Sequence, residues 1–263
     1  MREGIVKFVT FNPFRTIGID DVTYIKPEDS MKEIDKIAEA DVLLFPEYWQ
    51  VNTLVYGFKK RIFPSIETYH IGHTKVEQTR VMQGVFPEHV PYTLIKGCAA
   101  DMERDIFEHM PFPFIAKEIR NSMGQGVYLI HNHQDFIDYA IQNDVWYVQE
   151  YLPITKDLRI VWVGNKVIEA YWRINQGHEF LTNVSQGGII SYEHIPHEAI
   201  QLTEKIATTL GIDHAGFDFA QVGDRLYFFE FNVMFGNQGI RNKQYTDAIL
   251  EYLYGYTPFI VPA

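Results

Sequence analysis

The chain has 263 residues, of which 34 are Asp or Glu and 23 are Lys or Arg, and its formal net charge is −11 at pH 7. Hydrophobic residues make up 46% of the sequence and charged residues 22%, proportions that exclude an intrinsically disordered protein. The acidic balance also argues against nucleic acid as the main partner, because affinity for a polyanion comes largely from Lys and Arg side chains that neutralise phosphates.

The first third of the chain predicts a small parallel sheet. Two short β-branched or apolar runs, residues 5–10 and 41–45, are typical of strands, and a helix is predicted between them. Ser30 and Glu33 stand three residues apart before an apolar stretch, the spacing of a capping box at the start of this helix. A further helix is predicted over residues 73–83.

From residue 92 onward the patterns predict an α+β organisation without internal repeats or a long linker. The predicted strands cover residues 92–95, 114–119, 127–131, 145–152, 158–163, 166–174, 214–222 and 226–233. The predicted helices cover residues 136–141, 197–210 and 240–254. Gly-Asn at 164–165 and Gly-Asp at 223–224 are typical of hairpin turns, and residues 175–190 form a predicted loop.

The last predicted hairpin carries an unusual set of polar side chains. Side chains alternate between the two faces of a strand, so Glu230 and Asn232 point the same way. A connecting loop of three or five residues places Asp218 directly opposite Glu230. The same register places Phe219 opposite Phe229. A strict two-residue loop would instead put the two carboxylates on opposite faces of the sheet.

In the first register, the two opposed carboxylates indicate a metal site. Their mutual repulsion is on the order of 3 kcal/mol at an effective dielectric of 20, and a divalent cation removes that cost. Oxygen ligands from Asp, Glu and Asn side chains suit Mg²⁺ rather than zinc. The alternative is that this face is the solvated outer face of an amphipathic hairpin, where acidic side chains are common.

A lysine and a glycine-bearing turn indicate a second candidate site. Lys117 lies in an otherwise apolar strand, and the following turn supplies Ser122, Gly124 and Gly126. Glycines let backbone amides approach an anion closely. The pattern is neither a P-loop nor a dinucleotide fingerprint, and an ordinary hairpin turn is the alternative. A lysine just before the turn favours a phosphate site.

The order of these motifs resembles that of the ATP-grasp superfamily, in the branch of the RimK-like ribosomal-protein-S6 glutamate ligases and glutathione synthetase. The matching segments are residues 113–117, 122–127, 149–152, 157–159, 173, 183–188, 216–218 and 230–232. They extend over about half of the chain, and the match rests on the order and spacing of all of them.

The resemblance implies an α+β fold with an α/β N-terminal lobe, in which ATP is held between the central and C-terminal lobes. We therefore expect a short N-terminal lobe over residues 1–74. A linker helix and the central lobe would follow over residues 75–152, and the C-terminal lobe over residues 153–263.

The resemblance also implies how the nucleotide is bound. The residues it assigns to ATP are Lys75, Lys117, Ser122, Gly124, Gly126, Gln149, Glu150, Tyr151, Leu152, Asp157 and Asn183. Lys75 and Lys117 would contact the phosphates, and the glycine turn would close over them as a lid. The main chain of residues 149–152 would bind the adenine edge, and Asp157 the ribose hydroxyls.

The resemblance implies a catalytic role for Arg173, which would stabilise the transferred phosphoryl group together with Lys117. Asp218, Glu230 and Asn232 would hold one or two Mg²⁺ ions, or Mn²⁺. The implied activity is an ADP-forming ATP-dependent carboxylate–amine ligase that works through an acyl phosphate, on small-molecule or peptide carboxylate and amine substrates. The alternatives are an ATP-grasp small-molecule kinase and a catalytically silent nucleotide-binding regulatory protein.

We expect a cytoplasmic protein without a membrane partner. No apolar run approaches the ~20 residues that span a bilayer. The amino terminus lacks the long apolar core and small-residue cleavage site of a signal peptide. The single cysteine, Cys98, can close no internal disulfide. Whether copies of the chain form a homo-oligomer stays open.

Overall fold

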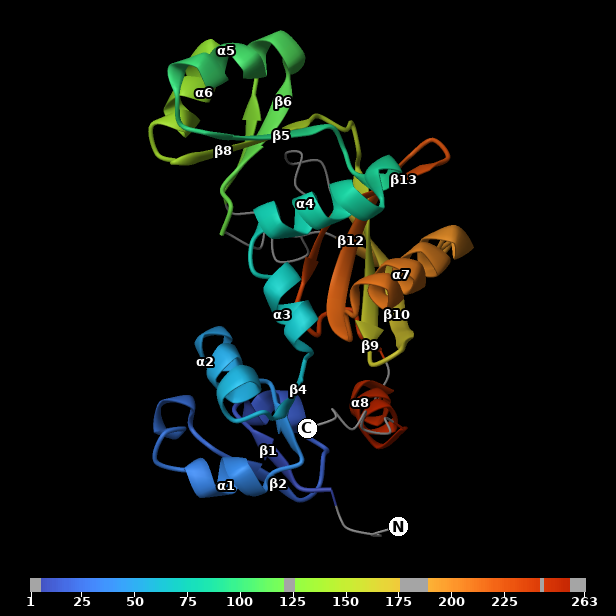
Figure 1. Cartoon of the computed structure of the whole chain (residues 1–263). Coiled ribbons are helices and arrows are strands. Elements are labelled where there is room, and N and C mark those ends of the chain that lie inside the picture. Colours follow the sequence, from blue (N-terminus) through green and yellow to red (C-terminus); the bar gives the residue numbers. More distant parts are fainter. Residues whose placement is uncertain (1–5, 121–125, 176–188, 242–243, 256–263) are drawn as a thin grey trace.

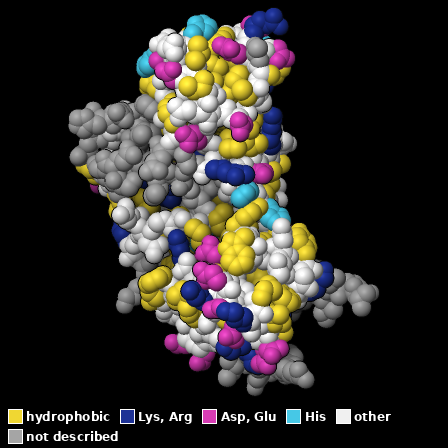
Figure 2. Space-filling view, turned by 90° about the vertical axis from the view of Figure 1, so that its left-hand side faces the viewer, with side chains coloured by type: hydrophobic (Ala, Val, Ile, Leu, Met, Phe, Trp, Pro, Cys, Tyr) yellow, Lys and Arg dark blue, Asp and Glu magenta, His cyan; other side chains and the backbone are white. Residues whose placement is uncertain are grey.

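Three β-sheets follow one another along the chain. The computed structural model describes residues 6–120, 126–175, 189–241 and 244–255. In Figure 1 the N-terminal sheet lies at the bottom, the central sheet at the top and the C-terminal sheet between them. Hydrophobic, basic and acidic side chains are intermixed over the described part of the face drawn in Figure 2.

The N-terminal sheet is parallel, as predicted. Its strands, in spatial order, are β2 (Val22–Tyr24), β1 (Phe8–Thr10), β3 (Val42–Leu44) and β4 (Arg61–Phe63). The helical segments around it are η1 (Pro13–Thr16), η2 (Pro27–Asp29), α1 (Ile34–Glu39), α2 (Tyr48–Asn52), the π-helix η3 (Thr53–Gly57) and α3 (Ile66–Ile71). Val9, Leu43 and Ile62 fill one core of this lobe, because parallel strands covered by helices bury apolar side chains.

The predicted capping box at Ser30 is wrong. Helix α1 begins at Ile34 with Glu33 at its N-cap, and no side-chain hydrogen bond caps it. Pro27 starts a separate 3-10 turn that ends at Asp29, and Ser30 follows it as the C-cap residue, where its hydroxyl donates to the Pro27 carbonyl instead. Gln50 of α2 donates to the same buried hydroxyl at 2.5 Å, so Ser30 connects η2 to α2 by hydrogen bonds.

The central sheet is antiparallel and is covered by two helices on one face. Its spatial order is β5 (Thr93–Gly97), β8 (Val145–Glu150), β6 (Phe114–Lys117) and β7 (Val127–Ile130). The helices are α5 (Ala100–His109) and α6 (His133–Ala140), which lie side by side at the top of Figure 1. Helix α5 was not predicted from the sequence. Ile106 is fully buried in the core that this helix covers, and Met102 and Phe107 pack against it partly buried.

The C-terminal sheet is the largest and contains both predicted hairpins. Its spatial order is β11 (Ile189–Ser191), β10 (Lys166–Ile174), β9 (Lys156–Val163), β12 (His214–Val222) and β13 (Arg225–Asn232), all antiparallel. One face packs on α7 (His197–Leu210), whose predicted bounds are confirmed. The helix ends where Gly211 adopts φ +70°, a left-handed conformation that glycine reaches without a steric penalty.

Helix α4 (Lys75–Val85) and the short η4 (Pro87–His89) pack on the same face as α7. Met82 and Phe86 join the aromatic core of the C-terminal sheet, and the Gln78 side chain hydrogen-bonds both backbone groups of Phe231 on the edge strand. The beginning of the stretch expected to lead into the central lobe therefore contacts the C-terminal sheet. The domain boundaries themselves stay a prediction.

The other face of the C-terminal sheet divides into an apolar and a charged half. The apolar half packs on α8 (Gln244–Gly255) and on the N-terminal lobe, through a shared core that includes Val161, Phe63 and Ile249. The charged half carries Asp157, Arg159, Arg173 and Asp218. Among the described residues, no helix is both long enough and apolar enough to cross a membrane.

Candidate active site

Asp218 and Glu230 are directly opposed on β12 and β13, as predicted, but the route to this register differs from the prediction. The turn has only two residues, with Val222 opposite Arg225. The register then shifts by one residue, because Phe229 is an extra residue on β13. Without this bulge, the two-residue turn would have turned Glu230 to the opposite face.

The bulge also corrects the predicted aromatic pairing. Phe219 lies opposite Phe228, not opposite Phe229 as expected. Phe217, Phe219 and Phe228 face the helix-covered core. Phe229 instead approaches the central lobe, with its ring centroid 5.1 Å from Nζ of Lys117. One inserted residue therefore separates a wholly apolar face from a charged one.

Four buried charged side chains form a compact cluster on the charged face. Asp218 accepts two hydrogen bonds from Arg159, at 2.5 and 2.9 Å, and Nη2 of Arg173 lies 3.0 Å from its Oδ1. Arg173 in turn donates two hydrogen bonds to Asp157, at 2.6 and 2.7 Å. All four side chains are at most 9% exposed, and two positive charges balance two negative ones. Such pairs are stable in the interior only when their geometry is this complete.

Strand register accounts for both bidentate pairs. Asp157 is the register partner of Arg173 on β10, and Arg159 is the register partner of Asp218 on β12. Opposed residues on antiparallel strands have neighbouring Cβ atoms, so the two side chains of each pair can reach one another directly across the sheet. Asp157 and Arg159 alternate on one strand, which brings both pairs to the same face.

The cluster shifts the ionisation of its members. Burial pushes the pKa of Asp218 upward, but Arg159 and Arg173 together hold it below its usual value. Burial likewise opposes the charge on Arg173, yet Asp218 and Asp157 raise the pKa of its guanidinium. Asp218 and Arg173 are therefore both charged at neutral pH.

Two lysines from other elements approach Glu230. Nζ of Lys75, at the start of α4, lies 3.2 Å from a Glu230 carboxylate oxygen. Lys117 at the end of β6 donates to the Gln149 side-chain oxygen at 2.7 Å. Burial lowers the pKa of Lys117 from 10.5 to about 8, an effect that Glu230 opposes and Lys75 reinforces. The structure thus brings Lys75, Lys117 and Gln149 to the predicted metal ligands.

Gln149 is held so that its oxygen faces Lys117. Its Nε2 donates to the Thr93 hydroxyl at 2.8 Å, which determines the orientation of the amide. The backbone N–H of Glu150 already donates to the Tyr92 carbonyl, while Tyr151 and Leu152 follow the end of β8. The assignment of residues 149–152 to adenine stays a prediction. Residues 149 and 150 belong to the end of β8, and residues 151 and 152 lie beyond it.

Some of the predicted nucleotide-binding residues cannot be placed. Ser122, Gly124 and Asn183 lie outside the described residues. Gly126 is described and adopts φ +68°. A Cβ atom there would lie 2.8 Å from the Glu118 side chain, so the position requires glycine. The presence of glycine at position 126 is therefore explained by the backbone conformation of the turn and the nearby Glu118 side chain.

The donor chemistry of Asp218, Glu230 and Asn232 fits Mg²⁺, which prefers oxygen ligands. Asn232 follows Glu230 on the same face, with its Nδ2 3.5 Å from a Glu230 oxygen. No three His, Cys, Asp or Glu side chains in the described part of the chain gather in a metal-binding arrangement. The candidate set consists of two carboxylates and an amide, and both carboxylates have cationic partners.

Sequence reasoning missed Arg159 as a member of the site. It lies in the matched segment at 157–159, and its alternation with Asp157 on one strand was a usable signal. It also missed that Asp157 has Arg173 as a bidentate partner, which depends on pairing between two separate strands. The assignments of Asp157 to ribose and of Arg173 to the phosphoryl group stay predictions.

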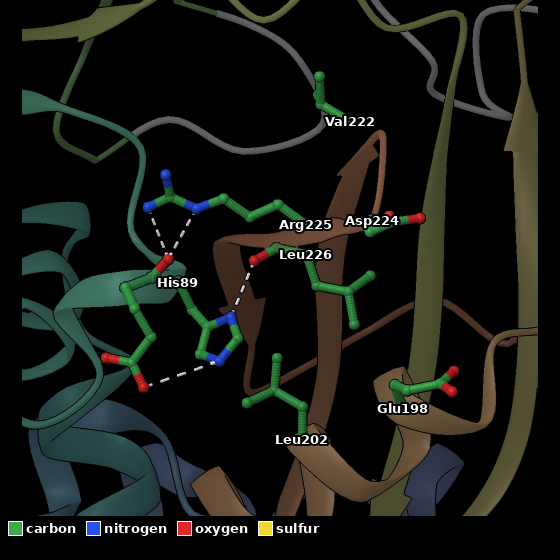
Figure 3. A pocket seen from close by; sticks show the side chains of 8 residues that line it. His89, Glu198, Leu202, Val222, Asp224, Arg225 and Leu226 are labelled. Carbon is green, nitrogen blue, oxygen red and sulfur yellow. Dashed lines mark hydrogen bonds and ion pairs between the residues drawn. The ribbon is translucent and has the colours of Figure 1, made fainter.

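A separate hollow of about 640 Å³ lies between η4, α7 and the β12–β13 turn (Figure 3). Its walls include Leu202, Leu226 and Glu198, and His89 hydrogen-bonds the Leu226 carbonyl at 2.9 Å. None of the predicted site residues lines it. It belongs to the helix-covered side of the sheet, away from the charged face.

The chain is similar to a family model and to several known proteins. A family model described as the RimK-like ATP-grasp domain matches residues 82–253. The chain is 31% identical over 141 residues to the ribosomal protein bS6–L-glutamate ligase of Salmonella paratyphi B, a match that covers 51% of this chain and 47% of that protein. The chain thus spans about half the length of the curated relatives it matches.

Solved structures are similar over nearly the whole chain. The D-alanine–D-alanine ligase of Bacillus anthracis has a TM-score of 0.72 at 12% identity, covering 96% of this chain and 98% of that one. A RiPP-associated ATP-grasp ligase of Chryseobacterium gregarium, solved with ADP and a leader and core peptide, has a TM-score of 0.70 at 13% identity, covering 97% and 98%. At these identities the likeness shows the fold.

Proposed function

The chain belongs to the RimK-like ATP-grasp family, and on that premise we propose that it is an ADP-forming ATP-dependent carboxylate–amine ligase. The predicted α+β ATP-grasp fold is confirmed by the neighbouring structures. The fold alone does not determine the activity, because the same fold can support different chemistries.

The observation that carries the proposal is the opposition of Asp218 and Glu230 next to two arginines and two lysines. Phosphoryl transfer depends chiefly on positioning and on neutralising phosphate charge. Such a site needs cations for the phosphates and carboxylates for a metal ion. These cations and carboxylates come from six elements: β6, α4, β9, β10, β12 and β13.

We propose that nucleotide binding exchanges partners within the cluster. The ATP phosphates would attract Lys75, Lys117 and Arg173, while Asp218, Glu230 and Asn232 would hold Mg²⁺, one or two ions, or Mn²⁺. The metal would neutralise phosphate charge. The cluster is neutral as it stands and the triphosphate of ATP carries about four negative charges, so two divalent cations, or one together with Lys75 and Lys117, would compensate most of that charge.

In the proposed reaction, an oxygen of the substrate carboxylate attacks the γ-phosphorus of ATP, and the bond to ADP breaks. The amine nitrogen of the second substrate then attacks the acyl carbon. The bond between the acyl carbon and the phosphate oxygen then breaks, inorganic phosphate leaves with the electron pair of that bond, and the amine nitrogen loses one proton, which yields an amide. Arg173 would stabilise the charge on the transferred phosphoryl group.

We propose amino acids or peptides as the substrate class. The Salmonella relative is named for a ribosomal protein and L-glutamate, and the Chryseobacterium structure contains peptides. A peptide or protein carboxylate as one partner, and a cytoplasmic location, are consistent with these relatives and stay part of the proposal.

The test is ADP release by the full chain with MgATP, screened over amino acids and short peptides taken pairwise, with hydroxylamine added in parallel. A ligase forms a hydroxamate, because hydroxylamine traps the acyl phosphate. ADP release with a stable phosphorylated product and no hydroxamate would identify a small-molecule kinase instead. ATP binding without ADP release over the whole panel would identify a silent nucleotide-binding protein.

A further inference from the structure

Arg15, in the N-terminal lobe, has a nitrogen without a hydrogen-bond partner. Its Nη2 donates to the Phe235 carbonyl at 2.6 Å, and its guanidinium carbon lies 5.6 Å from the centre of the Phe235 ring. Its Nη1 is buried and, among the side chains that the structure describes, is the one buried nitrogen or oxygen atom with no partner. Arg15 belongs to η1, the turn that follows β1.

The groups around the Arg15 guanidinium are uncharged at neutral pH. His214 is fully buried, and burial together with Arg15 lowers its pKa to about 3. Burial raises the pKa of Tyr245, whose hydroxyl lies beside the guanidinium, to about 12. Burial also raises the pKa of Tyr69 well above its ordinary value. In the described parts of the chain, no carboxylate forms an ion pair with Arg15.

A guanidinium keeps its charge under all physiological conditions and matches a carboxylate through two parallel hydrogen bonds. A buried donor without a partner costs free energy, so each one in a native structure calls for a physical reason. Arg15 uses one terminal nitrogen for the Phe235 carbonyl, and the Tyr245 hydroxyl also interacts with its side chain, but Nη1 has no partner within hydrogen-bond distance and no carboxylate of the described chain pairs with the guanidinium. An anionic ligand satisfies that donor and the uncompensated charge together.

Arg15 is connected to the candidate active site through Phe235. A Cβ atom at Gly216 would lie 2.9 Å from Cβ of Phe235 and 2.8 Å from Nη1 of Arg159. Gly216 precedes Asp218 by two residues on β12, so both lie on the charged side of the sheet. Phe235 therefore separates Arg15 from the Arg159–Asp218 pair by about one side chain.

The chemistry of ligation, on which this inference rests, indicates which anion belongs there. The carboxylate that attacks ATP is consumed, because its carbon becomes the amide carbon. An amino acid that supplies the amine keeps its own carboxylate through both steps. Arg15 lies beside the charged face of the C-terminal sheet, where it suits a carboxylate that stays ionised throughout the reaction.

We propose that Arg15 binds the carboxylate of the amino acid that supplies the amine. The amine substrate is then a free amino acid rather than a simple alkylamine or a lysine side chain of a protein. Arg15 is thus a specificity-determining residue contributed by the N-terminal lobe.

The test compares the full-length wild type with Arg15→Met, Arg15→Lys and the control Arg104→Met. Arg104 is an exposed arginine on α5 that contacts Glu108. Binding of each of the twenty common L-amino acids is measured by calorimetry with ADP and Mg²⁺ present, and each binder is then compared with its carboxamide. Thermal unfolding and ADP affinity are recorded for every variant.

We expect at least one amino acid to bind wild type at least tenfold more tightly than its carboxamide. Arg15→Met should weaken binding of the acid at least tenfold and reduce the preference to within twofold, and Arg15→Lys should fall between. Arg104→Met should match wild type, and ADP affinity should stay within twofold throughout. If Arg15→Met does not fold, the intermediate preference of Arg15→Lys decides.

Binding of no amino acid by wild type, or an unchanged acid preference in both Arg15 variants, overturns the inference. The hydroxylamine assay on wild type separates this failure from failure of the ligase proposal. A hydroxamate together with Arg15-independent binding refutes the role of Arg15 alone. Arg15-dependent amino-acid binding without any hydroxamate or ADP refutes the ligase and leaves a carboxylate-binding site.

Discussion

Asp218 lies directly opposite Glu230 on the neighbouring strand, although the turn between the strands has only two residues. The extra residue Phe229 compensates for the short turn and returns both carboxylates to one face. The two carboxylates nevertheless have different surroundings. Asp218 is bound by two buried arginines, whereas Glu230 is 23% exposed and paired with Lys75. Their substitutions should therefore have different effects.

Glu230→Gln should abolish ADP release with little loss of stability. The change removes a metal-binding charge at nearly constant volume, and because Glu230 is 23% exposed, losing its pair with Lys75 should cost less than breaking a fully buried pair. ADP release and the urea midpoint are the measurements. Glu204→Gln, an exposed position on α7, is the matched control and should match wild type in both. Wild-type turnover by Glu230→Gln would contradict the proposed metal site.

Asp218→Asn should lose both turnover and stability. It leaves Arg159 and Arg173 buried with one carboxylate, that of Asp157, between them, and breaking such a buried pair costs about 3–5 kcal/mol. Urea unfolding measures the loss, and Asp224→Asn in the exposed turn serves as the control. A stability equal to that of Glu230→Gln would show that the arginine cluster does not depend on Asp218.

ATP binding should take up a proton at pH 9. Burial lowers the pKa of Lys117 to about 8, so the free protein carries a largely neutral amine at this pH. Bound phosphates favour the charged amine and raise its pKa again, so binding draws in a proton and ATP affinity falls as pH rises above about 8. Calorimetry in two buffers of different ionisation enthalpy measures the uptake.

Lys117→Met should abolish this proton uptake and weaken ATP binding at pH 7. The exposed Lys36→Met is the control, and it should retain the uptake of wild type. Equal uptake by wild type and Lys117→Met would assign the proton to another group.

Asp213→Asn should stabilise the protein at pH 8 but not near pH 4. Burial raises the pKa of Asp213 from 3.8 to about 7, so the folded state favours the protonated form. Stability from this group is present below about pH 4 and is lost as pH rises through about 7. Asparagine stays neutral and keeps the oxygen that accepts from Ser65 and Thr68.

We expect a gain on the order of 1–3 kcal/mol at pH 8, measured by denaturant unfolding at both pH values. Asp247→Asn, at an exposed position of α8, is the control and should leave the pH dependence unchanged. A pH slope in Asp213→Asn equal to that of wild type would contradict the raised pKa.

Several elements could be predicted because their signals are local. The α7 helix has apolar periodicity and a glycine at its end, and the two hairpins have Gly-Asn and Gly-Asp turns between alternating strands. The capping box predicted at Ser30, also from a local signal, is wrong. Pro27 starts a competing turn, and the Ser30 hydroxyl hydrogen-bonds within that turn. Helix α5 was missed although Met102, Ile106 and Phe107 stand at helical spacing and pack in one core, so a usable signal was present.

By itself, the sequence determined the strands that carry Asp218, Glu230 and Lys117 and, through the resemblance of its motifs, the family. Only the tertiary structure decided the bulge at Phe229, the pairing of Asp157 with Arg173, and the isolated guanidinium of Arg15. The physical reason is the separation along the chain of the groups that interact. Turns, caps and alternation depend on neighbours along the chain, whereas ion pairs and unmet donors depend on which distant strands and lobes come into contact.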